Sequence, residues 1–200
     1  MVVLLLLGLL QLAVPGLAQS PPSGTVKITK FTYSGSGCPR GSAEGVVSSD
    51  GQTLTLIFSK YTVSTPGSTS NRRKNCQVGV TLMYPTGFTF TLGTVTFRGY
   101  AQFEQGVKGT LAAAYYFSGI QGTVRVSRNL PPPVEGNFEF TDQFVTFVYQ
   151  PCDRQPLMLN LNSEARVMPP PSPSKSAGLI TVDSQDLSLR QLFRLRWKKC

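Results

Sequence analysis

Positively charged side chains gather at two places in this sequence. The first is a short run inside a polar loop, just before the second cysteine, and the other alternates with apolar residues near the C-terminus. Clustered cations attract anionic surfaces such as an acidic glycan, a phospholipid head group or a cell-wall polymer. The competing explanation is a solvated basic segment that keeps the protein in solution. The six predicted ligand-binding residues are Arg72, Arg73, Lys74, Arg194, Arg196 and Lys198.

Residues suited to hydrolysis are scarce. The chain contains no histidine, which excludes Ser-His-Asp and Cys-His nucleophiles, H-E-x-x-H zinc sites and a histidine base. Two carboxylate pairs are close in sequence, Glu135 with Glu139 and Asp183 with Asp186. A glycosidase needs its two carboxylates about 5 to 10 Å apart across a cleft, which sequence proximity does not show. Solvated charges on strand edges and turns explain them better, and no catalytic residue is predicted.

One enzymatic alternative survives the absence of histidine. A lyase that acts on an acidic polysaccharide can use a tyrosine or lysine base, with cations that neutralise the uronate. No spacing in the chain selects a catalytic set. The residues of the right type are Tyr61, Tyr84, Tyr100, Tyr115 and Tyr116.

The N-terminus has the pattern of a secretory signal peptide. An apolar run covers residues 2–14, and Pro15, Gly16 and Ala18 follow it, so that small residues stand where signal peptidase cleaves. The run is shorter than the roughly 20 residues of a transmembrane helix. We therefore predict a signal peptide over residues 1–18, an extracellular location and no transmembrane segment.

Four cysteines in a secreted chain favour two disulfides, because an oxidising compartment makes pairing the default. Three connectivities are open. The sequential one is favoured, Cys38 with Cys76 and Cys152 with Cys200, since each bridge then closes a loop of moderate length. A zinc site is poorly supported without histidine or C-x-x-C spacing, so no metal and no cofactor are predicted.

The charge balance bears on the choice of partner. Nineteen lysines and arginines against ten acidic residues give a net charge of +9, which on its own would suggest nucleic acid. Secretion makes nucleic acid an unsuitable physiological partner. An acidic polysaccharide or another anionic surface is the predicted partner, and the oligomeric state is left open.

Apolar and polar residues alternate with a period of two along most of the chain, which predicts strands. No long amphipathic helix separates the strands, so we expect an all-β fold, an antiparallel β-sandwich resembling a jelly roll and stapled by two disulfides. The predicted strands cover residues 25–33, 44–50, 53–63, 77–84, 88–93, 94–103, 110–117, 137–149, 156–162 and 186–200.

Residues 19–200 are expected to form a single domain. The segment 64–75 is a predicted polar loop, and the proline-rich segment 168–178 is predicted to be an extended surface loop. In the tail, Phe193, Leu195 and Trp197 fall on one face and the cations on the other. A strand fits this period better than a basic amphipathic helix, which is the alternative.

An ordered series of short segments resembles a known family. "YSGSGCPRGS", "NCQVGVTLMYPTGFTF", "FRGYAQF", "YYFSG", "PCDRQPLMLNLNSEARV" and "FRLRWKKC" occur in this order, as in the small secreted proteins of domain of unknown function 4360, common in fungi. The resemblance spans about residues 24–200. It implies one secreted β-rich domain framed by the four cysteines, with no established catalytic residues. A proline-rich insertion at 169–173 and the high positive charge set this chain apart.

These observations lead to a hypothesis of a secreted, non-enzymatic protein that works at an extracellular or cell-wall surface by binding acidic polysaccharide. Two alternatives come from other classes. One is a polysaccharide-active enzyme of lyase type. The other is a secreted effector or inhibitor that acts on a host or a competitor.

Overall fold

The computed structural model describes residues 20–130, 135–154, 156–171, 175–181 and 188–200. The predicted signal peptide, residues 1–18, lies outside the described residues, as do Asp183 and Asp186. None of the helices in the described part has both the length and the apolar character to cross a membrane.

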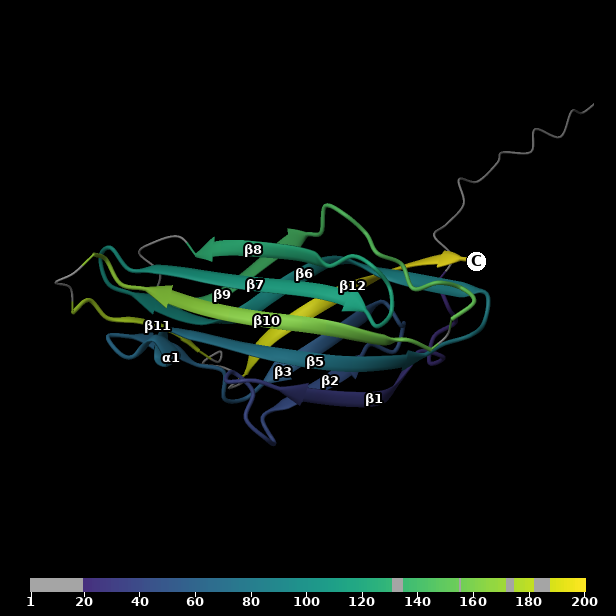
Figure 1. The fold of residues 1–200 in the computed structure, drawn as a ribbon, viewed down its shortest axis with the longest axis horizontal. Coiled ribbons are helices and arrows are strands. Elements are labelled where there is room, and N and C mark those ends of the chain that lie inside the picture. Colours follow the sequence, from purple (N-terminus) through teal and green to yellow (C-terminus); the bar gives the residue numbers. More distant parts are fainter. Residues whose placement is uncertain (1–19, 131–134, 155, 172–174, 182–187) are drawn as a thin grey trace, which may run out of the picture.

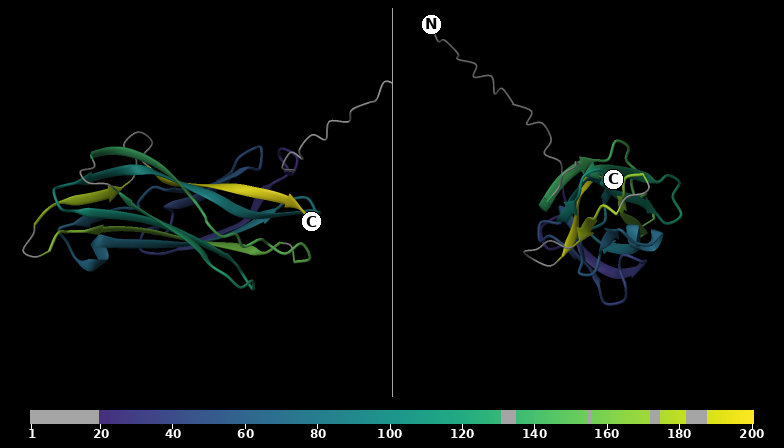
Figure 2. Two further views of the ribbon diagram at one scale, coloured as in Figure 1. Left: turned by 90° about the horizontal axis from the view of Figure 1, so that it is seen from above. Right: turned by 90° about the vertical axis from the view of Figure 1, so that its left-hand side faces the viewer.

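Two antiparallel sheets face each other and form a β-sandwich (Figures 1 and 2). Sheet A contains, in spatial order, β1 (Lys27–Ser34), β5 (Arg73–Met83), β10 (Met158–Met168), β7 (Lys108–Phe117) and β8 (Val124–Leu130). Sheet B contains β2 (Ala43–Val47), β3 (Thr53–Phe58), β12 (Leu189–Lys199), β6 (Phe88–Phe103), β11 (Gly178–Thr181) and β4 (Val63–Thr65), with β9 (Glu135–Gln143) also paired to β6. The predicted all-β sandwich is confirmed.

The core lies between the two sheets and is built from alternate residues of each strand. In β12, Phe193, Leu195 and Trp197 are buried, whereas the cations between them are exposed. The Trp197 ring packs edge-on against Tyr84 at 5.0 Å between centroids. The predicted two-faced strand at the C-terminus is therefore confirmed, and the apolar face fixes the direction in which the cations point.

Two disulfides staple the sandwich in the favoured connectivity. Cys38 pairs with Cys76 and Cys152 with Cys200, with Cα atoms 5.6 and 5.9 Å apart. Gly35 lies in the turn that leads to Cys38 and has a φ of 155°. Residues with a side chain disfavour this conformation. The glycines before this cysteine therefore serve the turn at the disulfide.

The predicted strand over residues 53–63 is interrupted, which is a correction to the sequence prediction. β3 ends at Phe58, and Tyr61 turns into the core before β4 begins. The Tyr61 hydroxyl lies 3.1 Å from the carbonyl oxygens of Lys74 and Ser163, to which it can donate. A buried hydroxyl needs such partners, and they hold the chain out of strand geometry here.

Other boundaries also differ from the expected ones. The predicted loop 64–75 contains a single helical turn, α1 (Thr69–Arg72), and β5 already begins in it. The predicted strand 137–149 ends at Gln143. Strands β8 and β11 were not predicted. Within the segment 168–178, the first and last residues belong to β10 and β11, and the other described residues have no regular structure.

Buried tyrosines should make the folded protein less stable at alkaline pH. Burial raises the pKa of Tyr61, Tyr84 and Tyr115 above the ordinary value near 10. The unfolded chain loses these protons above about pH 10, whereas the folded chain keeps them. We expect the free energy of unfolding to fall as the pH rises beyond about 10, as measured by urea denaturation alongside phenolate absorbance.

A matched pair of variants assigns this effect. Tyr61→Phe removes a buried phenol and should flatten the alkaline decline, and Tyr116→Phe, at a position that is 36% exposed, is the control for removing a tyrosine. Complete phenolate formation in the folded protein would contradict the expectation.

Candidate functional site

Three cations of β12 form a row on the outer face of sheet B. Arg194, Arg196 and Lys198 are all exposed, and we call them the C-terminal cation row. The strand beneath them is firmly held, because the Trp197 indole N–H donates to the Gly51 carbonyl oxygen at 2.8 Å and the Leu195 N–H donates to that of Gln52 at 2.8 Å. The row therefore stands on a rigid element.

A bulge beside the row makes room for one of its side chains. The register between β12 and β6 shifts between Arg194 and Leu195, which leaves Gly93 of β6 without a directly paired residue. A Cβ atom on Gly93 would lie 2.6 and 2.7 Å from Cδ and Cγ of Arg196. The missing side chain at this position therefore allows the stem of Arg196 to cross β6.

Two aromatic rings lie against the row. The guanidinium of Arg196 is 4.5 Å from the centroid of Phe147, and the ammonium of Lys198 is 3.9 Å from that of Tyr149. Both are within cation–π range. The Phe147 side chain is 40% exposed, so it offers an apolar surface to a ligand as well as a support to the arginine.

The aromatic segment 144–150 is irregular yet well anchored. The Phe144 N–H donates to the Gly93 carbonyl oxygen at 3.0 Å, and the Gln150 N–H donates to that of Phe90 at 3.2 Å. Just beyond it, the Cys152–Cys200 disulfide joins the segment to the end of β12. Two hydrogen bonds and one disulfide therefore position the two rings beside the cations.

The row borders two depressions of about 360 and 270 Å³. Both are lined by Arg194 and Arg196. The first also includes Thr94, Gln143 and Phe147, and the second includes Ser20, Gln52, Tyr149 and Trp197. Cations, amides and aromatic rings thus converge at one end of the sandwich.

One carboxylate stands close to the row. The pKa of Asp50 is lowered, first by a hydrogen bond from the Ser48 hydroxyl, then by the Gln52 N–H, and to a smaller degree by Arg194. Asp50 therefore stays charged at neutral pH, but most of its interactions are local to its own turn. It offsets only part of the positive charge of the row.

The other predicted basic cluster, residues 72–74, does not lie near the C-terminal cation row. Arg72 ends α1, while Arg73 and Lys74 begin β5 of sheet A. In Figures 1 and 2, α1 and the C-terminus lie toward opposite ends of the molecule. The structure therefore keeps the C-terminal cation row together but separates it from residues 72–74.

The residues of the run itself also diverge. Arg73 forms a salt bridge of 2.8 Å with Glu164. Lys74 follows Arg73 directly in the strand, and successive strand residues point to opposite faces of the sheet. The run of three cations in the sequence is thus not a single patch in space.

Phe147 and Tyr149 were missed by the sequence reasoning. A signal for them exists, because the favoured Cys152–Cys200 pairing brings the residues just before Cys152 close to those just before Cys200. Applied to the sequence, that pairing would have placed both aromatic residues near Arg196 and Lys198.

Several of the described residues considered for enzymatic roles are too far apart or too deeply buried for such a role. Glu135 and Glu139 are four residues apart on β9, which separates them by about 14 Å along the strand. That distance exceeds the range for a glycosidase pair. Among the tyrosines, Tyr61, Tyr84 and Tyr115 are buried with raised pKa values. Within the described residues, no group of three or more potential metal ligands comes together.

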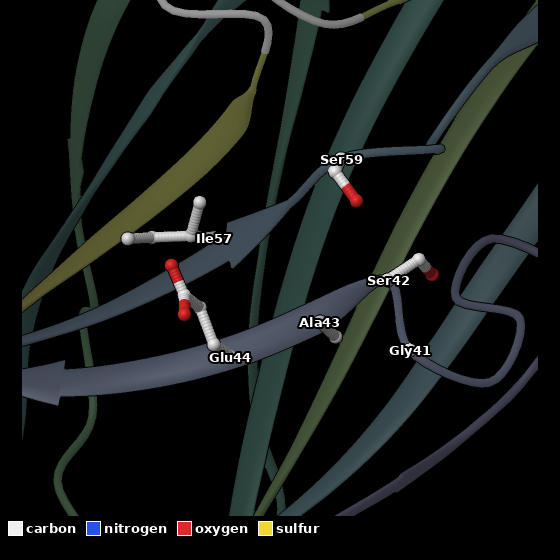
Figure 3. A pocket seen from close by; sticks show the side chains of 6 residues that line it. All are labelled: Gly41, Ser42, Ala43, Glu44, Ile57 and Ser59. Carbon is white, nitrogen blue, oxygen red and sulfur yellow. The ribbon is translucent and has the colours of Figure 1, made fainter.

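A further pocket, of about 230 Å³, lies on the edge strand β2 and its neighbour β3. Figure 3 shows Glu44 beside Ile57, with Ser42 just before β2 and Ser59 just after β3. The Ser42 hydroxyl donates to the Pro39 carbonyl oxygen at 2.6 Å, so it serves the turn. With Glu44 as its charged group, this pocket does not match an anionic ligand.

Replacing Gly93 by alanine tests how Arg196 is positioned. The new methyl group must displace the arginine stem and move its guanidinium away from Phe147. Under the hypothesis of acidic-polysaccharide binding, the affinity for polygalacturonate should fall about threefold to tenfold without unfolding. In a double-mutant cycle, Gly93→Ala should add little to Arg196→Ala. Full additivity would show that the glycine acts in another way.

Two solved structures are distantly similar to this chain. A carbohydrate-binding module, TmCBM61 in complex with beta-1,4-galactotriose, is 14% identical with a TM-score of 0.31, over 83% of this chain and 89% of that chain. The family 11 carbohydrate-binding module of Clostridium thermocellum, in complex with a beta-1,3-1,4-mixed-linked tetrasaccharide, is 9% identical with a TM-score of 0.27, over 90% and 98%. Such low TM-scores indicate a loose resemblance, so neither ligand carries over to this chain.

Sequence comparison is more informative. An "Uncharacterized secreted protein" of Arthroderma benhamiae is 36% identical over 189 residues, which cover 92% of this chain and 76% of the relative. The relative confirms the expected secretion. Residues 24–200 match the family model described as "Domain of unknown function (DUF4360)", as the order of the short segments predicts. The chain belongs to this DUF4360 family.

Proposed function

We propose that this secreted protein acts without catalysis, by binding an acidic polysaccharide at an extracellular or cell-wall surface. The observation that carries the proposal is the C-terminal cation row with Phe147 and Tyr149 beside it. Exposed positive charge on a rigid strand thus lies beside exposed aromatic surface from the segment 144–150.

The spacing of the row suits a linear polymer. Alternate residues of a strand repeat about every 6.8 Å, so Arg194, Arg196 and Lys198 extend three charges over about 14 Å. A polymer with a carboxylate on successive sugars can engage all three cations together. Arginine additionally pairs with a carboxylate through two parallel hydrogen bonds.

The aromatic rings add two effects. They hold Arg196 and Lys198 in place, which lowers the entropy lost when a ligand orders these long side chains. The exposed part of Phe147 can also pack against the apolar face of a sugar ring. The second effect favours a sugar polymer over a simple inorganic polyanion.

The test compares polygalacturonate with the same polymer after full methyl esterification, which removes the charge but keeps the backbone. We expect calorimetry to show binding of the acid form only. Binding should weaken when NaCl rises from about 20 mM to about 0.5 M, because the screening length falls from roughly 20 Å to roughly 4 Å. Equal binding of the two polymers would contradict an electrostatic site.

A further inference from the structure

A second concentration of positive charge surrounds a cavity at the end of the molecule that carries α1 (Figure 1). The cavity measures about 230 Å³ and lies between α1 and the ends of β5 and β10. Its lining consists of Thr69, Arg72, Arg73, Arg166, Val167 and Met168. Three of these six residues are arginines, and each carries a guanidinium group. One of them, Arg166, is not part of the basic run in the sequence.

Two of the arginines oppose each other directly. The register of the β5–β10 pair places Arg73 opposite Arg166. Like charges at directly opposed positions of antiparallel strands destabilise the sheet. An anion between them would turn this repulsion into attraction.

The third arginine has unused hydrogen-bonding capacity. The Nε atom of Arg72 is buried, and no hydrogen-bond partner for it occurs among the described residues. One of its terminal nitrogens lies 3.4 Å from the Thr69 hydroxyl oxygen. A buried donor without a partner is costly, and a bound oxyanion would supply the missing acceptor.

The local carboxylate does not neutralise this charge. Glu164 accepts from Arg73 at 2.8 Å and also lies 3.8 Å from Arg125 of β8. One negative charge is thus shared by two arginines. In the part of the chain that the structure describes, neither Arg72 nor Arg166 forms a salt bridge.

We infer that this three-arginine cavity binds a phosphate group, either as free phosphate or as a monoester. A compact ion with about two negative charges and several acceptor oxygens matches converging guanidinium groups better than a single carboxylate does. The site is distinct from the C-terminal cation row, in both its position and the shape of its ligand.

The test is calorimetric titration of the full secreted protein with inorganic phosphate and with glycerol phosphate, with acetate at equal ionic strength as the control. We expect both phosphate compounds to bind and acetate to bind at least about tenfold more weakly. Arg166→Gln should weaken phosphate binding about tenfold or more. Acetate binding as tight as phosphate, or no phosphate binding at all, would overturn the inference.

A second variant separates a lost site from a lost fold. Arg166→Glu places a carboxylate opposite Arg73, so it should abolish phosphate binding while keeping or raising the melting temperature. Unchanged phosphate affinity in this variant would also overturn the inference. Arg166→Gln should leave polygalacturonate affinity unchanged, and Arg196→Gln should leave phosphate affinity unchanged, so that each site can fail independently of the other.

Discussion

The triple variant Arg194→Gln, Arg196→Gln and Lys198→Gln should bind polygalacturonate at least about 100-fold more weakly than the natural protein at low salt. Each hydrogen bond to a charged group contributes about 1.5 to 3 kcal/mol, and three such groups act on one polymer. All three side chains are exposed on β12, so the fold should be retained. Calorimetry or affinity electrophoresis in the presence of the polymer measures the effect.

A charge-matched control distinguishes position from total charge. Lys27, Lys30 and Lys108 are exposed on β1 and β7 of sheet A, and their replacement by glutamine removes the same three positive charges. We expect this control to bind polygalacturonate within about twofold of the natural protein. Equal losses in the two triple variants would show that only the net charge of +9 attracts the polymer.

Removing the second disulfide with Cys152→Ser and Cys200→Ser should lower both stability and binding. The bridge closes a loop with a sequence separation of 48 residues, which corresponds to about 4 kcal/mol in the chain-entropy estimate. It also ties the segment carrying Phe147 and Tyr149 to the end of β12. We expect urea denaturation to show the loss of stability and polygalacturonate affinity to fall about threefold to tenfold.

The other disulfide provides the matched control. Cys38 and Cys76 close a loop with a separation of 38 residues, so their removal should destabilise by a similar amount. They lie away from the cation row, in the turn after β1 and in β5. Under conditions where both variants are folded, only the first should lose affinity. Equal affinity in the two would show that the bridge does not position the aromatic segment.

The fold was largely predictable because period-two alternation records which face of each strand is buried. In β12 the alternation of Phe193, Leu195 and Trp197 with cations was sufficient to predict a strand with two distinct faces. The same signal failed around Tyr61, where a buried hydroxyl is satisfied by carbonyl groups from distant strands. Those partners are more than ten residues away, so local patterning does not contain them.

The candidate site was predictable only in part. Alternation placed the three C-terminal cations on one face, but the aromatic partners come from an irregular segment whose strand pattern ends at Gln143. The opposition of Arg73 and Arg166 depends on strand register, which is set by long-range pairing. Conversely, Arg72, Arg73 and Lys74 are adjacent in sequence yet do not form a single patch, because a helical turn ends and a strand begins within the run.

The most direct test of the proposed function is an NMR titration of the folded protein with trigalacturonate, a short oligomer with three carboxylates. We expect the largest shift changes at the side chains of Arg194, Arg196 and Lys198 and at the rings of Phe147 and Tyr149. Changes confined to the three-arginine cavity, or no changes at all, would contradict polysaccharide binding by the C-terminal cation row.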